Sequence, residues 1–342
     1  MSYSKTDYSK QDARSWGKGA LKGVVNVTVP SFTGDFRRLN EAAIRHDIEL
    51  HIANGFAGTL LVSEVAISIE EYGRFCAIAS EQAAGRLMIV GHAAFGTLSD
   101  NIEATRLAAA NGATLSLLTY PPSFYAETLG QIREHTRAFC DAVDIAVMLF
   151  PLPTWGFGRV DNADMPVALL RELLADCPNI VALKAEAGYP NIMGYIECHR
   201  HFSGSVVVSC PIEADMIALS QILPIQFSAT SNTEYYGPMI PRIFGLLRAG
   251  HYDEATTLYW QINPARKANG VAAASWAGTG LINRLQWKYQ AWLSGYNGGA
   301  LRQPSMRLSD ELMRVLRQGL VKSGLPVTDL HDREFFIGRN PA

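Results

Sequence analysis

Short apolar segments that alternate with longer amphipathic segments are the feature that most restricts how this sequence can fold. Eight such segments, rich in Val, Ile and Leu, begin at residues 23, 58, 87, 113, 145, 180, 206 and 225. The stretches between them have the apolar spacing of helices, and several end in Gly or Asn-Gly, where helices commonly stop. Strands that are apolar throughout are typical of parallel sheets covered by helices. Eight strand–helix units in roughly 230 residues predict an α/β fold of the (β/α)8 TIM-barrel type.

A doubly wound open sheet is the alternative fold with the same alternation. Its dinucleotide-binding fingerprint, G-x-G-x-x-G, does not follow the first apolar segment. The strand pattern ends after Gly250, and the remaining segments have helical spacing. We therefore expect a flexible N-terminal arm over residues 1–20, the barrel over residues 21–250, and C-terminal helices packed on the barrel over residues 251–342.

The composition argues against several classes of partner. The 342 residues carry a formal net charge of −2, without the basic excess that nucleic-acid binding needs. No apolar stretch approaches the roughly eighteen residues that span a bilayer, and the polar start lacks the apolar core of a signal peptide. The five cysteines are scattered and form no C-x-x-C pair. These features predict a cytoplasmic protein with reduced cysteines and neither a nucleic-acid nor a membrane partner.

Lys184 is an unusual residue for the end of a buried strand. The segment from Ile180 is apolar until this lysine, and Glu186 follows two positions later. Side chains alternate along a strand, which predicts that Lys184 points into the mouth of the barrel with Glu186 above it. A lysine in a dry pocket has a lowered pKa and becomes a nucleophilic amine. The alternative is a solvent-exposed lysine at a strand end, which is the common case.

The segment NIVALKAEAG, residues 179–188, resembles the Schiff-base strand of the dihydrodipicolinate synthase and N-acetylneuraminate lyase superfamily. The resemblance extends over about residues 22–325. It includes VTVPSFTGD in the first unit, VSEVAISIEEY in the second, YPPSFY and LFPLPTWG after the fourth and fifth strands, and IQFSATSN at the eighth. It implies an oligomeric barrel, a tetramer or dimer, in which Lys184 forms an imine with a 2-oxo acid such as pyruvate. The expected activity is that of a class I lyase.

Three features depart from that family pattern. Most members carry Gly-Thr-Thr-Gly-Glu after the second strand, whereas this chain has a shorter loop that leaves Ser63 and Glu64. Phe150 stands in place of the tyrosine that relays protons, and a phenyl ring has no proton to exchange. Trp155 stands in place of the arginine that binds a second carboxylate in the synthase branch. The lysine-biosynthetic condensation is therefore not expected.

The missing tyrosine requires another proton-transfer group. The candidates, in order of preference, are Glu64, then a tyrosine among Tyr125, Tyr235 and Tyr236, and then His92. Each has a structural alternative: Glu64 as a helix-start carboxylate, the tyrosines as packing residues, and His92 as a hydrogen-bonded core residue.

Polar and aromatic residues of the mouth loops are the candidates for substrate binding. They are Ser63, Phe150, Trp155, Glu186, Ser209, Ser228, Thr230, Asn232, Tyr235 and Tyr236. Groups that end the eighth strand could hold the carboxylate that the shorter loop no longer binds, unless they only satisfy loop backbone. The rings favour an apolar or aromatic aldehyde as the second substrate, unless they pack between subunits.

The predicted reaction is aldol cleavage or condensation between a 2-oxo acid and such an aldehyde, with no cofactor. The alternatives are a dehydratase of a 2-oxo-3-deoxy acid that uses the same imine, and a barrel that only binds a metabolite. The segment ECHRHF, residues 197–202, contains potential metal ligands, but its alternating histidines do not share a helix face. We expect no metal site there.

Overall fold

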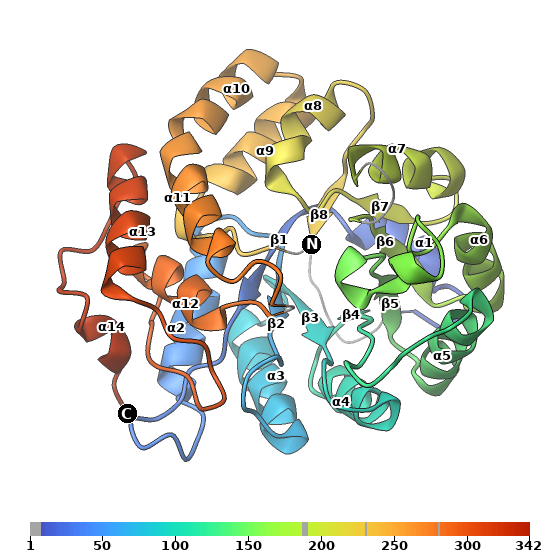
Figure 1. Ribbon diagram of the computed structural model, residues 1–342, viewed down its shortest axis with the longest axis horizontal. Coiled ribbons are helices and arrows are strands. Elements are labelled where there is room, and N and C mark those ends of the chain that lie inside the picture. The colour runs from blue at the N-terminus through green and yellow to red at the C-terminus, as the bar shows by residue number, and fades with distance from the viewer. Residues whose placement is uncertain (1–7, 187–190, 230, 280) are drawn as a thin grey trace.

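Eight parallel strands form one sheet that curls into a nearly closed barrel (Figure 1). The structure, a computed structural model, describes residues 8–186, 191–229, 231–279 and 281–342. The strands are β1 (Gly23–Thr28), β2 (Gly58–Leu61), β3 (Met88–His92), β4 (Leu115–Leu117), β5 (Ala146–Leu149), β6 (Ile180–Lys184), β7 (Val207–Ser209) and β8 (Phe227–Ala229). Their order in the sheet is β7-β6-β5-β4-β3-β2-β1-β8. The predicted (β/α)8 barrel is confirmed.

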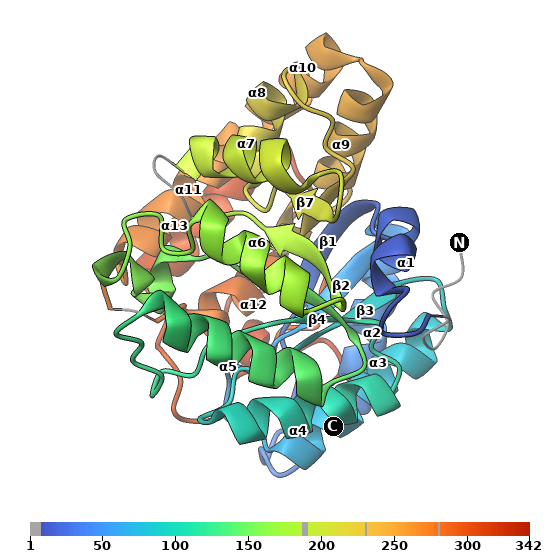
Figure 2. The same cartoon turned by 90° about the vertical axis from the view of Figure 1, so that its right-hand side faces the viewer.

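Helices cover the outside of the barrel, and Figure 2 shows α5, α6 and α7 side by side over one part of its wall. The helices between strands are α2 (Glu41–Ala53), α3 (Ile69–Ala83), α4 (Leu98–Ala110), α5 (Leu129–Ala142), α6 (Val167–Asp176), α7 (Asn191–Phe202) and α8 (Met216–Ser220), and α9 (Met239–Ala249) follows β8. The side chains of Asn40, Ser68, Thr97 and Thr128 accept backbone amides at the starts of α2 to α5. These caps satisfy amides that the first helical turn leaves unpaired.

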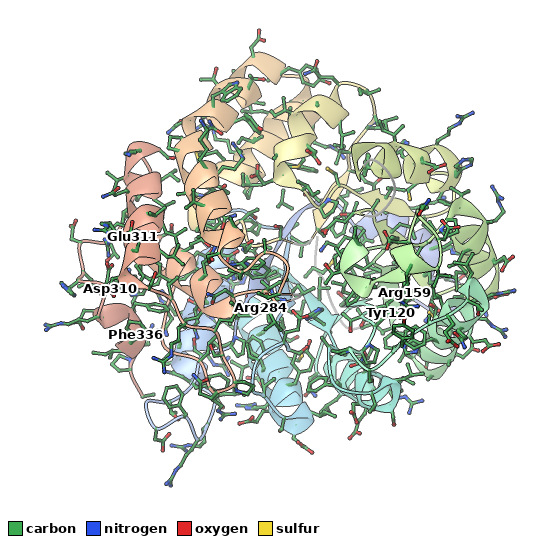
Figure 3. The ribbon with its side chains drawn as sticks, viewed as in Figure 1. Tyr120, Arg159, Arg284, Asp310, Glu311 and Phe336 are labelled. Atoms are coloured by element: carbon green, nitrogen blue, oxygen red, sulfur yellow. The ribbon has the colours of Figure 1, made fainter. Side chains whose placement is uncertain are left out.

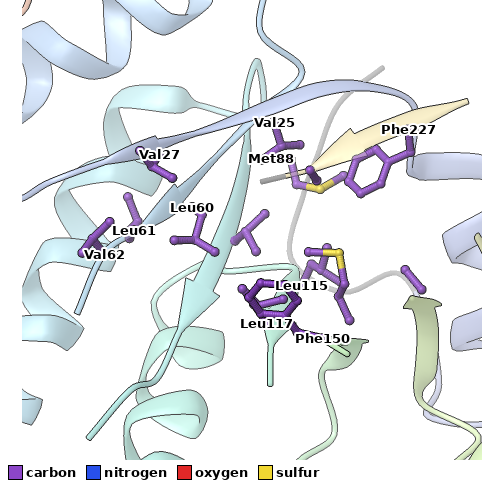
Figure 4. Packing of buried hydrophobic residues seen from close by; sticks show 14 of the residues in the cluster. Val25, Val27, Leu60, Leu61, Val62, Met88, Leu115, Leu117, Phe150 and Phe227 are labelled. Carbon is purple, nitrogen blue, oxygen red and sulfur yellow. The ribbon is translucent and has the colours of Figure 1, made fainter. Parts of the chain in front are cut away.

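A glycine lies between two larger side chains where β1, β2 and β3 pair. In the register of the sheet, Gly58 of β2 lies between Val25 of β1 and Met88 of β3. A Cβ atom at Gly58 would lie 2.9 Å from the Met88 Cβ and 3.1 Å from Val25 Cγ2. Figure 4 shows Val25 and Met88 close together, with Phe227 of β8 beside them. The interior is therefore a packed core, so a ligand is expected at the mouth of the barrel.

The two end strands of the sheet, β7 and β8, are joined through serine side chains. The Ser209 hydroxyl donates to the Ala229 carbonyl at 2.9 Å and accepts from the Ala229 amide at 2.8 Å. The Ser228 hydroxyl donates to the Cys210 carbonyl at 2.7 Å. Both hydroxyls are thus engaged by backbone groups, the structural alternative to carboxylate binding.

The predicted C-terminal helices are present, and one of them packs deeply against the barrel. These helices are α10 (Tyr252–Gln261), α11 (Asn263–Ala274), α12 (Arg284–Leu293), α13 (Asp310–Lys322) and α14 (Glu334–Ile337). Every residue of α12 except Trp287 is buried. Lys288 of α12 donates to the Pro30 carbonyl beyond β1 at 2.6 Å. Within the described parts of the chain, no helix has the length and apolar character needed to cross a membrane.

Buried charged groups meet where α12 approaches β1 and α2. Lys288, Asp47, His51 and Glu234 line a cavity of about 20 Å³, enough for one water molecule. Burial lowers the pKa of Lys288 and raises that of Asp47, and the charge of each partner opposes the shift of the other. Asp47 also accepts the Asn297 amide at 2.6 Å. These polar contacts fix α12 relative to the barrel, and with it any α12 side chain that faces the mouth.

The prediction of a flexible arm over residues 1–20 is wrong for the part of that segment that the structure describes. Residues Ala13–Ala20 form helix α1, whose Arg14 donates from Nε to the Ile180 carbonyl at 3.0 Å and from Nη2 to the Cys177 carbonyl at 2.9 Å. Gly17 of α1 packs on Val181 of β6. The segment suggests a loop because it is short and contains two glycines. Gly17, however, has no side chain and therefore permits the close approach of α1 to β6. Residues 1–7 lie outside the described residues.

Two glycines of α1 test whether this helix is packed or loose. Alanine is the better helix former by about 1 kcal/mol. Gly17→Ala adds a methyl group 2.9 Å from the Val181 Cβ, whereas nothing lies within 4 Å of a Cβ built at Gly19. We expect Gly19→Ala to keep or raise the free energy of unfolding and Gly17→Ala to lower it by about 1–3 kcal/mol. Urea denaturation measures both, and equal stabilities would show that α1 does not pack on β6.

Candidate active site

Lys184 ends β6 in a buried position at the mouth of the barrel. It is 5% exposed, and its Nζ lies 3.0 Å from Glu186 Oε1. The Phe150 ring, which follows β5, covers the amine with its centroid 3.7 Å from Nζ. The alternation of strand side chains brings Lys184 and Glu186 together, and the neighbouring strand supplies the ring.

Burial sets the protonation behaviour of Lys184. Removal from water lowers the pKa of Lys184 below its ordinary 10.5, and Glu186 opposes this shift by charge and by a hydrogen bond. The face of the Phe150 ring also attracts an ammonium group. Because burial is the larger effect, a larger share of this amine is neutral near pH 7 than in an exposed lysine. Only the neutral amine can attack a carbonyl carbon.

Trp155 fixes the loop that carries Phe150. Its indole Nε1 donates to the Phe150 carbonyl at 2.7 Å, and the two rings meet edge to face with centroids 5.9 Å apart. Tyr120, Phe124 and Phe157 extend this aromatic cluster behind Trp155. Figure 3 shows Tyr120 beside the loop after β5. The wall of the site next to the amine is therefore apolar and held in place by ring contacts.

Ser63 and His92 are built into the wall between β2 and β3. The Ser63 hydroxyl donates to the His92 carbonyl and accepts from the Ala94 amide at 2.9 Å. The His92 amide donates to the Tyr72 hydroxyl at 2.6 Å. Burial, and secondarily the nearby Lys184 charge, lowers the pKa of His92 to about 3, and among the described residues its Nδ1 has no partner. The imidazole is therefore neutral at pH 7.

Glu64 forms an ion pair that the sequence gives no reason to expect. Its carboxylate contacts Nη2 of Arg284, the first residue of α12. The Arg284 side chain is 9% exposed and that of Glu64 is 38% exposed. Figure 3 shows Arg284 over the barrel close to the end of β2. Glu64 stays a candidate general base, now with a cation as its partner.

The remaining candidates that the structure describes have neighbours or environments of their own. Tyr125 is 70% exposed, and the Arg159 guanidinium lies 3.5 Å above its ring. Tyr235 and Tyr236 are buried and share a 2.8 Å hydrogen bond between their hydroxyls. Asn232 is buried, and its Nδ2 has no partner among the described residues. Thr230 lies outside the described residues.

Arg284 is the functional candidate that sequence reasoning misses. It lies 220 positions after Glu64, within a segment whose helical spacing indicates only packing. The available signal is the density of polar residues in NRLQWKYQ, where Asn283, Gln286 and Lys288 are buried together with it. Across the residues that the structure describes, no group of three or more His, Cys, Asp and Glu is arranged to hold a metal ion.

Together, the fold and the site define a (β/α)8-barrel protein with a buried lysine at the carboxyl end of its sixth strand. Residues 20–320 match the model of the Dihydrodipicolinate synthetase family, and the chain belongs to this family. The resemblance inferred from the sequence is thereby confirmed.

Individual relatives are distant in sequence. The 4-hydroxy-tetrahydrodipicolinate synthase of Methylibium petroleiphilum is 27% identical over 292 residues, which cover 83% of this chain and 92% of that protein. The same enzyme of Leptothrix cholodnii is 31% identical over 150 residues, 42% of this chain and 48% of that protein. The chain thus spans about half the length of several curated relatives that it matches.

Solved structures confirm the fold. Dihydrodipicolinate synthase from Aquifex aeolicus superposes with a TM-score of 0.75 at 19% identity, covering 90% of this chain and 100% of that chain. N-acetylneuraminate lyase from Fusobacterium nucleatum superposes with a TM-score of 0.72 at 16% identity, covering 89% and 99%.

Glu186 is expected to set the pH at which Lys184 becomes reactive. Its carboxylate favours the ammonium form, so Glu186→Gln should lower the pKa of Lys184 further. Carbamylation of Lys184 by cyanate, followed by peptide mass mapping across the pH range, should reach half its maximal rate at a lower pH in this variant. Glu172→Gln on α6, an exposed carboxylate 3.1 Å from Arg133, is the matched control. The assignment is contradicted if the pH of half-maximal carbamylation in Glu186→Gln is equal to or higher than that in the Glu172→Gln control.

Proposed function

We propose that the protein is a Schiff-base lyase in which Lys184 forms an imine with a 2-oxo acid such as pyruvate. The observation that carries this proposal is the buried amine at the mouth, with its lowered pKa and a carboxylate at 3.0 Å. Membership of the Dihydrodipicolinate synthetase family supports the same class of chemistry. The 4-hydroxy-tetrahydrodipicolinate synthase and N-acetylneuraminate lyase names of its relatives also support it.

The proposed chemistry begins with proton transfer from the Lys184 ammonium to Glu186. The neutral amine then attacks the ketone carbon, forming a C–N bond. The hydroxyl of this adduct leaves as water with the proton that Glu186 returns, which gives the protonated imine. The imine accepts the electron pair when the C–C bond of an aldol breaks, which releases the aldehyde; condensation is the reverse. Glu186 is within the distance at which a general base acts on the amine. Glu64 is the proposed group for the proton on the aldol hydroxyl.

The second substrate is proposed to be an apolar or aromatic aldehyde. Phe150 and Trp155 supply an apolar wall beside the amine, and the Trp155 N–H is already engaged by the Phe150 carbonyl. An aldehyde that carries a carboxylate would find no cation at Trp155. A dehydratase that uses the same imine, and a barrel that only binds a metabolite, remain the alternatives; turnover of an aldol with release of its aldehyde separates both from the proposal.

A reduced cytoplasmic location and a homo-oligomeric state, dimer or tetramer, are proposed alongside the activity. All five cysteines are buried free thiols, which supports a reducing compartment. The oligomeric state rests on the resemblance to the family.

Borohydride reduction in the presence of pyruvate is the direct test of the imine. We expect a reduced adduct on Lys184, located by peptide mass mapping, and no adduct in Lys184→Gln. Lys288 is an internal control, because it is also buried with a lowered pKa but donates to the Pro30 carbonyl and borders Asp47. An adduct on Lys288, or no adduct with any 2-oxo acid, would refute the proposal.

The identity of residue 155 predicts which condensation the protein does not catalyse. Trp155 offers no positive charge to the carboxylate of aspartate semialdehyde. We therefore expect no measurable condensation of this aldehyde with pyruvate at enzyme concentrations that give full trapping of Lys184. Efficient condensation in a coupled assay would show that another group supplies the missing cation.

A further inference from the structure

A 2-oxo acid brings a carboxylate to the mouth of the barrel, and three serine hydroxyls predicted to bind substrate are already engaged. Ser63, Ser209 and Ser228 all bond to backbone groups. The amine itself is committed to the carbonyl carbon. A carboxylate that leaves water for a partly buried site needs a charged or hydrogen-bonding partner, or its burial is costly. The proposed function therefore leaves the partner of this charge unassigned.

Arg284 is a buried cation beside the loop after β2, with incomplete hydrogen bonding. It contacts Glu64 of that loop, whose Ser63 donates to the His92 carbonyl at the end of β3. The charge of Lys184 contributes to the lowered pKa of His92. Among the described residues, its Nε is buried and has no hydrogen-bond partner. Its guanidinium stacks on the Trp287 ring at 4.1 Å. Asn283 caps α12 by accepting the Gln286 amide at 3.1 Å, so the base of the side chain is fixed.

Two other arginines with glutamate partners show what a completed structural pair looks like. Arg266 binds both oxygens of Glu213 and donates its third nitrogen to the Tyr259 carbonyl. Arg302 binds both oxygens of Glu71 and donates to the Phe36 carbonyl. Their glutamate side chains are 14% and 28% exposed, against 38% for Glu64. Arg284 therefore differs from both in its unpartnered Nε and in a partner that can turn into solvent.

We propose that Arg284 binds the carboxylate of the 2-oxo acid and that Glu64 is the internal anion which this carboxylate displaces. The proposal rests on the proposed function for the identity of the ligand. The planar guanidinium matches a carboxylate through two parallel hydrogen bonds. Exchange of one carboxylate for another keeps the charge around Arg284 constant, and it frees the Glu64 carboxylate for its proposed role at the aldol hydroxyl. The C-terminal helix thus supplies a cation where the loop after β2 is short.

The test uses binding to a protein that cannot form the imine. In a Lys184→Gln background, the affinity for pyruvate is measured by calorimetry against methyl pyruvate, which lacks the charge. Adding Arg284→Met should weaken pyruvate binding about tenfold or more and leave methyl pyruvate binding unchanged. Adding Glu64→Gln should tighten pyruvate binding, because it removes the competing anion. General damage to the mouth would weaken both ligands in both variants, so the opposite signs identify the exchange.

Matched controls address folding and position. Arg314→Met removes another arginine with one glutamate partner, Glu311, on the distant surface helix α13 (Figure 3). It should change neither affinity. Arg284→Lys keeps the charge but loses the planar fork, and it replaces Arg284→Met if thermal unfolding shows that the methionine variant does not fold. It should lose part of the preference for pyruvate over methyl pyruvate.

The possible failures are distinguishable from one another. The assignment of Arg284 is overturned if pyruvate affinity is unchanged by its substitution, if Glu64→Gln weakens binding, or if the Lys184→Gln protein binds no pyruvate. Borohydride trapping of the unsubstituted protein tests the imine separately. Trapping without an Arg284 effect overturns the carboxylate site alone, whereas Arg284-dependent binding without trapping overturns the imine alone.

Discussion

The site depends on keeping one amine dry beside one carboxylate. Lys184 is removed from water because β6 ends inside the mouth. The Phe150 ring covers the amine and keeps water away from it. Full compensation by Glu186 would hold the lysine permanently as ammonium, and without any compensation its burial would destabilise the fold. Lys184 lies between these limits, because it has a single carboxylate at 3.0 Å and burial has the larger effect on its pKa. The aromatic wall around Trp155 maintains that balance because it holds Phe150 in place.

The C-terminal helices take part in the mouth as well as in the packing. α12 is fixed on the barrel by Lys288 at the Pro30 carbonyl and lies against the cluster that contains Asp47 and Glu234. Burial raises the pKa of Glu234 well above its ordinary value in the same cluster. The same helix begins with Arg284, which contacts Glu64 in the loop after β2. The anchor at Lys288, in the middle of α12, therefore positions a cation about one turn earlier, at the start of the helix.

The sequence predicts what depends on local periodicity and fails where the outcome depends on distant contacts. All eight strands and the C-terminal helices are recognisable because apolar spacing differs between strand and helix. Lys184 is recognisable because a charge at the end of an apolar strand is unusual. The hydrogen bonds of Ser209 and Ser228 to backbone groups cannot be recognised from the sequence, because they form only where β7 and β8 meet. The pair of Glu64 and Arg284 is also invisible, because only the folded chain brings two such distant positions together.

The packing of α1 on β6 affects the buried lysine at the opposite end of that strand. Arg14 and Gly17 hold the first half of β6, and Lys184 is its last residue, four residues or about 13 Å farther along. A strand this short in a packed wall transmits displacement as a nearly rigid rod. A bulky fusion partner joined close to α1 would therefore disturb the position and orientation of the Lys184 amine, although it would be attached at the opposite face of the barrel. The packing at the bottom of the barrel therefore helps to fix the position of the Lys184 amine at the top.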